Sequence, residues 1–244
     1  RSVMMLIDGD IIAYRMAWAC DEETNVAFVK SSTDTFVSNL LLVYDGLVEG
    51  YQLYLTGTGN FRHDYAVTAP YKGNRKARPA PRLLLTIRQH LIEQWGAVVV
   101  EGEEADDAIA IAATAMGDLA IMASIDKDFD QIGGTHYDFI KNREYYIDEV
   151  QGLKFFYKQI ITGDAIDNII GVEGVGQQGA FDLINGCRNE SDMWDIVRDQ
   201  LGDDRALENA RLAWLRREVG QIWEPPTTRS TEEVWYGEAT STTH

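Results

Sequence analysis

Short apolar runs alternate with amphipathic stretches through the first 150 residues. The apolar runs cover residues 3–7, 53–55, 97–100, 119–122 and, less regularly, 137–140. Continuous runs of this length are typical of strands that are buried on both faces of a parallel sheet. Between them, apolar side chains recur with a helical period at 33–47, 82–95 and 105–115. The pattern predicts an α/β fold with a central, mostly parallel sheet flanked by helices.

After about residue 150 the strand pattern fades and helical periodicity takes over. Helices are predicted at 153–162, 178–184, 193–201 and 206–222, with Pro225 and Pro226 closing the last one. We therefore expect three parts: an α/β core at 1–150, a helical subdomain at 151–224 and an extended tail at 225–244.

Composition predicts a soluble protein of the cytoplasm, and we expect it to be a monomer. The 244 residues are 45% hydrophobic but contain no run of eighteen apolar residues, which argues against a membrane span. Asp8 and Asp10 interrupt the N-terminal apolar residues too early for the apolar segment of a signal peptide. Cys20 and Cys187 lack the spacing of a zinc site or a disulfide framework.

Charge is distributed unevenly. The formal net charge of −17 argues against a nucleic-acid partner, because such proteins usually present a basic surface. The segment from Phe61 to Arg82, however, contains one acidic residue and six basic residues: Arg62, Lys72, Arg75, Lys76, Arg78 and Arg82. Tyr71 precedes Lys72, and an aromatic ring beside several cations suits a nucleic-acid strand, with stacking on the ring and phosphate contacts to the cations. A solvated basic loop is the alternative interpretation.

Acidic residues follow the predicted strands and helices in four clusters. They are Asp8 with Asp10; Glu104, Asp106 and Asp107; Asp126 with Asp128; and Asp164 with Asp167. Taken singly, each cluster is compatible with helix capping or a surface turn. Together they predict a divalent cation site, because side chains at the carboxyl ends of parallel strands converge in one crevice. A set of carboxylates without His or Cys suits Mg²⁺ or Mn²⁺ rather than zinc.

Glycines at 171, 174, 176 and 179 predict a tight turn between two helices. Such a turn lets backbone N–H groups approach an anion closely. A dinucleotide-binding loop is disfavoured because the preceding strand and the later acidic residue are missing. We interpret Gly174, Gly176 and Gln178 as part of a helical hairpin that grips a nucleic-acid backbone.

These motifs occur in an order that resembles the flap endonuclease and 5′ exonuclease superfamily, particularly its compact phage and bacterial branch. The motifs are a strand ending in Asp8, Tyr-Lys-Gly-Asn-Arg at 71–75, Glu-Ala-Asp-Asp at 104–107, Asp-Lys-Asp at 126–128, Gly-Asp-x-x-Asp-Asn at 163–168 and the glycine-rich hairpin. The match runs from about residue 4 to residue 184. It implies a PIN-like fold with a helical arch at about 57–82 and a helix-hairpin DNA-binding motif in the C-terminal subdomain.

The resemblance also implies roles for individual residues. The implied metal ligands are Asp8, Glu104, Asp106, Asp107, Asp126, Asp128, Asp164 and Asp167. Lys72 and Arg75 correspond to active-site cations of a mobile arch, with Tyr71 and Lys76 beside them. Gly174 and Gly176 correspond to a duplex clamp, which in the family also holds a potassium ion.

The sequence departs from the family at two places. A further Asp often follows the strand before the arch, but here the chain reads Leu55-Thr56-Gly57-Thr58, which puts the affinity for a second metal in doubt. Asp10 is an extra acid that could replace the missing one. Gln178 stands where the hairpin usually carries a Lys.

The hypothesis from sequence is a nuclease that hydrolyses DNA near a free 5′ end with two metal ions. Ions near Asp8, Asp107, Asp126 and Asp128 would bind the scissile phosphate and lower the pKa of an attacking water. A haloacid-dehalogenase-like phosphatase with Asp8 as nucleophile is the alternative enzyme class, because Asp8-Gly9-Asp10 also fits its first motif. A non-catalytic DNA-binding relative is the third possibility.

Overall fold

The computed structural model describes residues 2–76 and 78–227, and the chain forms two compact units. The described residues of one unit, here called the sheet unit, are 2–61, 76, 78–152 and 215–221. Those of the other, here called the helical unit, are 62–75, 153–214 and 222–227. Two segments therefore lie on the other side of the boundary expected near residue 150. Most of the tail expected at 225–244 falls outside the described residues.

The sheet unit is built on six strands in the order β3-β2-β1-β4-β5-β6. The strands are β1 Met4–Asp8, β2 Gly50–Thr56, β3 Val98–Val100, β4 Ala120–Ala123, β5 Gly134–Asp138 and β6 Arg143–Ile147. Neighbouring strands are parallel except β5 and β6, which form an antiparallel hairpin. The expected mostly parallel sheet is confirmed. Strand β6 was not predicted, because its sequence Arg-Glu-Tyr-Tyr-Ile lies at the edge and lacks a continuous apolar run.

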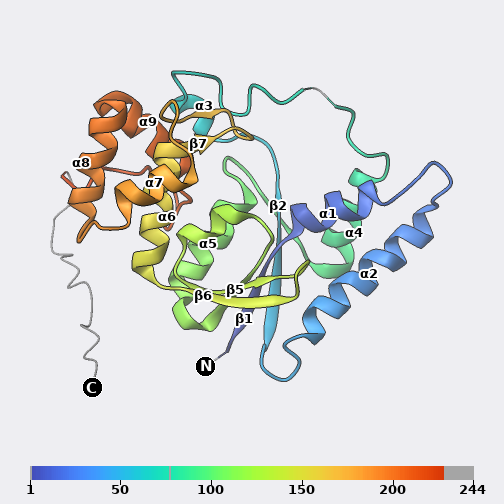
Figure 1. Ribbon diagram of the computed structural model, residues 1–244. Coiled ribbons are helices and arrows are strands. Elements are labelled where there is room, and N and C mark those ends of the chain that lie inside the picture. Colours follow the sequence, from blue (N-terminus) through green and yellow to red (C-terminus); the bar gives the residue numbers. More distant parts are fainter. Residues whose placement is uncertain (1, 77, 228–244) are drawn as a thin grey trace. The chain divides into compact units, whose positions relative to one another are not determined.

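Helices cover both faces of this sheet (Figure 1). Helices α1 Gly9–Trp18, α2 Val26–Leu42 and α4 Leu84–Trp95 pack on the face that receives Met5 and Ile7. Helix α5 Ala105–Met116 packs on the opposite face, against Leu6 and Met122. Successive residues of a strand point to opposite faces, so β1 supplies both cores. Helix α1, which begins directly after Asp8, was not predicted.

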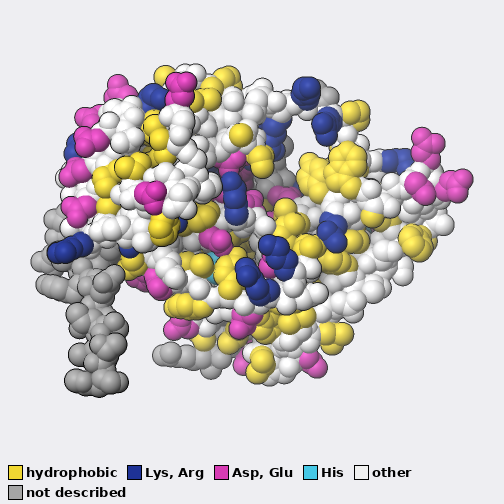
Figure 2. All heavy atoms as spheres, viewed as in Figure 1, with side chains coloured by type: hydrophobic (Ala, Val, Ile, Leu, Met, Phe, Trp, Pro, Cys, Tyr) yellow, Lys and Arg dark blue, Asp and Glu magenta, His cyan; other side chains and the backbone are white. Residues whose placement is uncertain are grey.

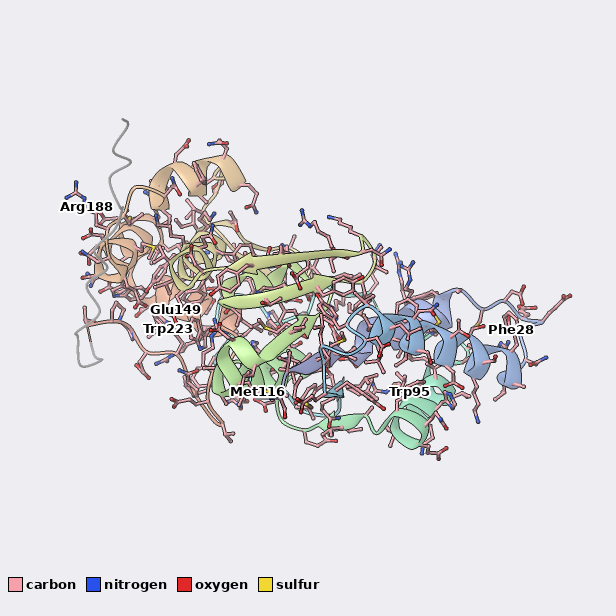
Figure 3. The ribbon with its side chains drawn as sticks, turned by 90° about the horizontal axis from the view of Figure 1, so that it is seen from below. Phe28, Trp95, Met116, Glu149, Arg188 and Trp223 are labelled. Atoms are coloured by element: carbon pink, nitrogen blue, oxygen red, sulfur yellow. The ribbon has the colours of Figure 1, made fainter. Side chains whose placement is uncertain are left out.

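The outer surface of α1 and α2 is partly apolar. Figure 2 shows hydrophobic side chains gathered over α1 and acidic side chains at the turn that joins α1 to α2. Tyr14 is 47% exposed and Trp18 62% exposed on α1. Phe28, 66% exposed, projects from the start of α2 (Figure 3). These side chains belong to neither core.

The helical unit packs four helices around a core of aromatic and aliphatic side chains. The helices are α6 Glu149–Thr162, α7 Gln177–Ile184, α8 Glu190–Leu201 and α9 Asp203–Ala213, accompanied by a two-stranded sheet of β7 Gly163–Asp164 and β8 Ile169–Ile170. The rings of Phe156 and Trp223 lie 5.7 Å apart, and those of Trp194 and Trp223 5.3 Å apart. The buried amide of Asn209 donates to the carbonyls of Ile160 and Ile170, which ties α9 to α6 and β8.

Two expectations about helices are wrong. The last helix was expected to reach residue 222 but ends at Ala213, where Trp214 turns to extended backbone. Residues 215–221 leave it because their contacts lie in the sheet unit. The arch at 57–82 was expected to be helical, but its described residues contain only the four-residue helix α3 Arg62–Tyr65. Pro70, Pro79 and Pro81 explain this, because proline disfavours helix at itself and at the residue before it.

No helix of the described residues combines the length and the apolar character that crossing a membrane requires.

Candidate active site

Asp8 stands at the carboxyl end of the central strand β1 and is only 2% exposed. Its carboxylate caps α1 by accepting the Ile11 N–H at 3.3 Å, and it accepts the Ser124 hydroxyl at 2.9 Å. Burial and then the charge of Asp10 raise the pKa of Asp8 to about 7, and Asp126 adds to the shift. A carboxylate in this environment is costly to ionise unless a cation accompanies it.

Ser124 joins the ends of the neighbouring strands β1 and β4. Its hydroxyl donates to Asp8 and accepts the Asp126 N–H at 3.1 Å. Asp126 in turn caps the short 3₁₀ helix η2, Lys127–Gln131, by accepting the Asp128 N–H at 2.9 Å. The Asp-Lys-Asp turn is therefore anchored to the residue that also orients Asp8. Sequence analysis did not single out Ser124, although it lies two residues before Asp126.

Asp106 belongs to the same acidic group. Loss of solvent and then the charges of Asp8 and Asp126 raise the pKa of Asp106 well above its usual range, and Glu104 also contributes. Its side chain has no hydrogen-bond partner among the residues that the structure describes. Asp8 at the end of β1, Asp126 after β4 and Asp106 at the start of α5 thus form one cluster of acids within electrostatic reach of one another.

Asp107, the next residue, has a different environment. It is fully buried, and its two oxygens accept backbone N–H groups of Glu104, at 3.0 Å, and Arg216, at 3.1 Å. The bond to Glu104 closes the first turn of α5. Asp107 therefore differs from Asp106 in accepting two backbone N–H groups, while its charge also contributes to the raised pKa of Asp106.

Asp10 also has a structural environment. Its carboxylate accepts the Thr56 N–H at 3.0 and 3.1 Å and the Thr56 hydroxyl, and it forms an ion pair with Arg88 at 3.0 Å. Arg88 also donates to the Thr56 carbonyl at 2.7 Å. These bonds occupy Asp10, so the idea that it replaces the acid missing near Thr56 is not supported by its contacts.

The chain beyond Thr56 is shaped by an acid from the neighbouring strand end. Glu101 accepts the N–H and the hydroxyl of Thr58, both at 2.7 Å, and these bonds lower its pKa. A side chain at Gly57 would meet the Glu101 carboxylate at 2.4 Å. Glu101 is exposed, and sequence analysis did not identify it as a candidate.

In the helical unit, two of the sequence motifs lie against each other. The Gly-Asp-x-x-Asp-Asn segment forms a turn in which Asp164 accepts the N–H groups of Ile166 and Asp167. The segment at 70–75 is bound to this turn by three backbone or amide contacts: Lys72 N–H to Asp167 carbonyl at 2.8 Å, Asn74 to Ala165 carbonyl at 2.6 Å and Asn168 to Pro70 carbonyl at 2.9 Å. Lys72 has a left-handed φ of 57°.

The two candidate cations share one acid. Arg75 forms an ion pair with Asp167 at 2.9 Å, and the Lys72 ammonium lies 3.9 Å from the same oxygen. The Arg75 side chain is 52% exposed, so it stays accessible to solvent. We expected a nucleic-acid strand to stack on the Tyr71 ring, and this is wrong. The ring is 3% exposed and packs with Ile169 and Leu212, which leaves no open face for stacking. Lys76 is exposed.

The glycine-rich hairpin leads into α7. Gly174 has a φ of 75°, a conformation that favours glycine, and Gly176 caps the helix. A side chain at either position would meet nothing within 4 Å, so the backbone there is open to a ligand. The Gln178 amide donates to Asp182 at 2.8 Å, one helical turn away.

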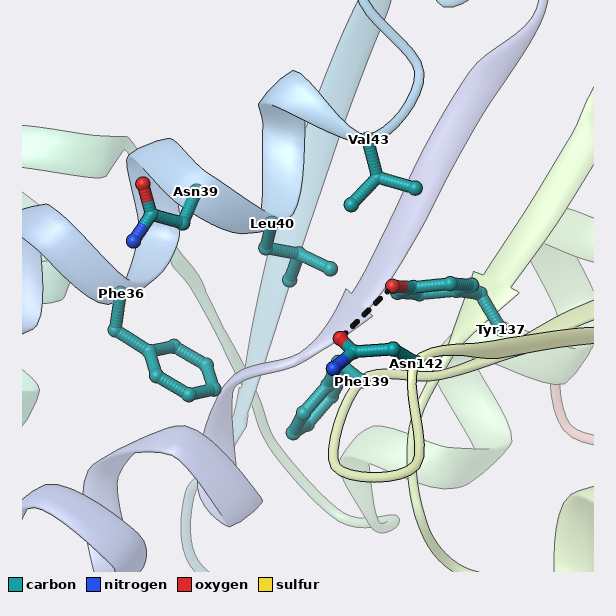
Figure 4. A pocket seen from close by; sticks show the side chains of 7 residues that line it. All are labelled: Phe36, Asn39, Leu40, Val43, Tyr137, Phe139 and Asn142. Atoms are coloured by element: carbon teal, nitrogen blue, oxygen red, sulfur yellow. Dashed lines mark hydrogen bonds between the residues drawn. The ribbon is translucent and has the colours of Figure 1, made fainter.

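A pocket of about 180 Å³ lies elsewhere in the sheet unit, between α2 and the β5–β6 hairpin (Figure 4). It is lined by Phe36, Asn39, Leu40, Val43, Tyr137, Phe139 and Asn142. The lining contains neither acidic nor basic side chains, so this pocket is not part of the metal-binding cluster.

Known proteins with similar sequences and folds are nucleases. No family model matches the chain. A flap endonuclease Xni of Shewanella denitrificans is 26% identical over 250 residues, which cover 91% of this chain and 93% of that protein. The flap endonuclease of Escherichia phage T5 is 24% identical, over 86% of this chain and 78% of its own length.

The fold comparison agrees. A crystal structure of the bacteriophage T5 flap endonuclease, in a pseudo-enzyme–product complex with DNA and metal ions, matches with a TM-score of 0.68, at 20% identity, over 86% of this chain and 88% of that chain. The chain is thus similar in sequence to flap endonucleases of bacteria and of a phage, and it shares the fold of the phage enzyme.

Several residues that shape the candidate site were not identified from the sequence. Ser124, Arg88 and Arg216 each contact a candidate acid through a bond that spans at least 78 positions. Single Ser and Arg residues lack a local pattern, and so only the Ser-x-Asp spacing at 124–126 offered a signal.

Proposed function

We propose that this chain is a metal-dependent nuclease that hydrolyses DNA phosphodiester bonds from or near a free 5′ end. The observation that carries the proposal is the cluster of Asp8, Asp106 and Asp126, whose charges act on one another. Asp8 and Asp106 have raised pKa values, which means that the fold holds negative charges together at a cost. Divalent cations bound by these carboxylates would remove that cost.

The residues present fit such ions. The ligands of the sheet unit would be Asp8, Glu104, Asp106, Asp126 and Asp128, all of which offer the oxygen atoms that Mg²⁺ and Mn²⁺ prefer. Asp107 would support them from its buried position. Asp164 and Asp167 enter the proposal as further ligands because of the family motif that contains them. The superfamily's two-ion site and the potassium ion at the hairpin are part of the same proposal.

When bound, the ions would polarise the scissile phosphate and make a bound water acidic enough to attack phosphorus. The protein's own groups perform the remaining tasks. Ser124 keeps Asp8 and Asp126 in fixed orientation through two hydrogen bonds. Lys72 and Arg75 supply positive charge for the phosphoryl oxygens, and their pairing with Asp167 keeps both on one side of the 163–168 turn.

The proposed substrate is a DNA duplex with a 5′ end or flap. The open backbone at Gly174 and Gly176 suits contact with a phosphate. The T5 relative was solved in complex with DNA and metal ions, which supports the same partner here. A monomeric protein acting in the cytoplasm remains the expectation, and light scattering of the purified protein would test the monomer.

The test is a cleavage assay with end-labelled 5′-flap, blunt duplex and single-stranded DNA, in Mg²⁺ and in chelator. The wild type should release short products only in Mg²⁺. Asp126→Asn and Asp106→Asn should each reduce the rate at least 100-fold while the proteins still bind the duplex. Asp118→Asn, an exposed acid just after α5, is the matched control and should keep the wild-type rate. Cleavage in chelator, or full activity of both site variants, would refute the proposal.

Two further measurements would distinguish the alternative functions. Turnover of p-nitrophenyl phosphate without DNA cleavage would favour the phosphatase, but the occupation of Asp10 by Arg88 and Thr56 argues against its use as an acid in that reaction. Tight binding of the flap substrate without cleavage in Mg²⁺ or Mn²⁺ would indicate the non-catalytic relative.

A further inference from the structure

Residues 215–221, here called the return segment, run along the sheet unit after α9 has ended. Leu215 is 3% exposed and packs in the core beneath α5, with Leu6 and Phe129. Its N–H donates to the side-chain oxygen of Gln131 at 2.8 Å. The return segment is therefore anchored to η2, the helix that follows Asp126.

Arg217 strengthens this anchor. Its guanidinium donates to the Gln131 carbonyl at 3.0 Å and to the Leu215 carbonyl at 2.8 Å. Its backbone N–H donates to the Gln221 side chain at 2.7 Å, which closes the segment into a loop. Burial lowers the pKa of Arg217, and the charge of Asp107 opposes that shift, so the guanidinium lies within electrostatic reach of α5 as well.

Arg216 connects the same segment to the start of α5. Its N–H donates to Asp107 at 3.1 Å, and its guanidinium pairs with Glu103 at 3.2 Å. The guanidinium also lies 3.6 Å from the centre of the Phe61 ring. Consecutive residues of the return segment thus contact two different acidic segments: Arg216 contacts the start of α5, and Arg217 contacts η2.

Both loops carry carboxylates that repel one another across the cluster. Asp106 follows Glu104 at the start of α5, and Asp126 and Asp128 stand at the start of η2. Like charges push such loops apart unless contacts with fixed geometry oppose them. Removing groups that orient metal ligands without binding the metal commonly changes the metal affinity.

We propose that the return segment sets the separation of the two acidic loops, with Arg217 and Gln131 as positioning residues for the divalent metal centre. The proposal rests on the proposed function, because it assumes that these carboxylates bind metal. It assigns a role in ion binding to a segment far along the chain from every acidic motif. In this proposal neither positioning residue is itself a metal ligand.

The experiment measures Mg²⁺ and Mn²⁺ binding to the full chain without DNA, by isothermal titration calorimetry. Arg217→Met keeps most of the side-chain volume and removes the charge and donors, and Gln131→Met removes the acceptor for Leu215. Each should weaken metal binding about tenfold. Arg217→Lys should recover part of the loss. Arg15→Met, an exposed arginine of α1, is the matched control and should bind metal as the wild type does.

A purely structural role would change other quantities. Circular dichroism would show a lower thermal midpoint, while the folded protein would bind metal normally. In cleavage assays, the expected signature is a half-saturating Mg²⁺ concentration raised about tenfold, whereas the rate at saturating Mg²⁺ stays near that of the wild type because the ligands are intact.

Folded Arg217→Met and Gln131→Met proteins with unchanged metal affinity would overturn the inference and leave the proposed function standing. If Arg217→Met does not fold, Gln131→Met and Arg217→Lys carry the same test. A wild type that binds neither ion would overturn the proposed function, and the inference with it.

Discussion

Replacing Asp8 by Asn should stabilise the metal-free protein at alkaline pH. Asp8 is 2% exposed, and its pKa is raised from 3.8 to about 7 by burial first and by the charge of Asp10 second. Asn is nearly isosteric, can still accept the Ile11 N–H at the start of α1 and can still meet the Ser124 hydroxyl. The substitution therefore removes the buried charge and keeps the local contacts.

The sign follows from proton binding. Between pH 3.8 and about 7 the folded protein holds a proton on Asp8 that the unfolded chain has lost, so the stability of the folded state falls as the pH rises through this window. Above about pH 7 the loss is complete. Three pKa units at 1.36 kcal/mol each set an upper limit of about 4 kcal/mol at pH 8. About half of this should be gone at pH 5.5.

The assay is urea denaturation of chelator-treated protein, followed by circular dichroism at pH 8 and pH 5.5. Asp8→Asn should unfold at a higher urea concentration than the wild type at pH 8, by about 2 to 4 kcal/mol in the free energy of unfolding. The difference should narrow by about 2 kcal/mol at pH 5.5. Asp118→Asn, which removes an exposed charge, controls for net charge and should show no such dependence.

Magnesium provides a second measurement. Added Mg²⁺ should raise the denaturation midpoint of the wild type and close the gap to Asp8→Asn, because ligands that bind only the folded state stabilise it. A variant that is less stable than the wild type at pH 8, or a gap that does not change with pH, would refute the electrostatic reasoning.

Three further predictions concern residues whose environments the structure decides. Tyr71→Ala should cost about 3–5 kcal/mol of stability because the ring is buried, whereas Tyr71→Phe should be nearly neutral; similar urea midpoints for both would contradict the burial. Asp107→Ala should lower the free energy of unfolding by about 2 kcal/mol or more, because two backbone N–H groups lose their acceptor. Asp106→Ala should not be destabilising in metal-free protein, and thermal denaturation that ranks the two variants in the opposite order would count against their assigned environments. Gly163→Ala should be much more destabilising than Gly174→Ala, since both have positive φ but only the former would place its side chain 2.3 Å from a carbonyl, that of Ile169; equal chemical-denaturation midpoints would argue against this packing.

Most strands of the parallel sheet could be predicted from local sequence because they contain short apolar runs, but the order of the strands could not. Four of the expected runs overlap the parallel strands β1 to β4. Apolar runs do not reveal elements that are buried on one face only. Strand β6 begins with the charged pair Arg143 and Glu144 and has no buried residue, and α1 begins directly after Asp8, in an acidic motif that the sequence analysis interpreted only as a candidate site.

The helix that ends at Ala213 shows a different limit. Apolar residues continue beyond it with a helical period, so local periodicity favours one long helix to residue 222. Leu215 instead enters the core beneath α5, and its N–H and the side chains of Arg216 and Arg217 find partners there. Tertiary contacts outweigh a helical propensity that amounts to fractions of a kcal/mol per residue.

By itself, the sequence determined the class of the fold, the order of the acidic motifs and the superfamily they resemble, because these depend on residue type and spacing along the chain. Only the tertiary structure decided which acids face one another and which face backbone. Asp106 and Asp107 are adjacent and chemically identical, yet one joins the cluster with Asp8 and Asp126 and the other accepts two N–H groups. Arg216, one of the two groups that bind Asp107, lies 109 positions away in the chain, where no local pattern extends.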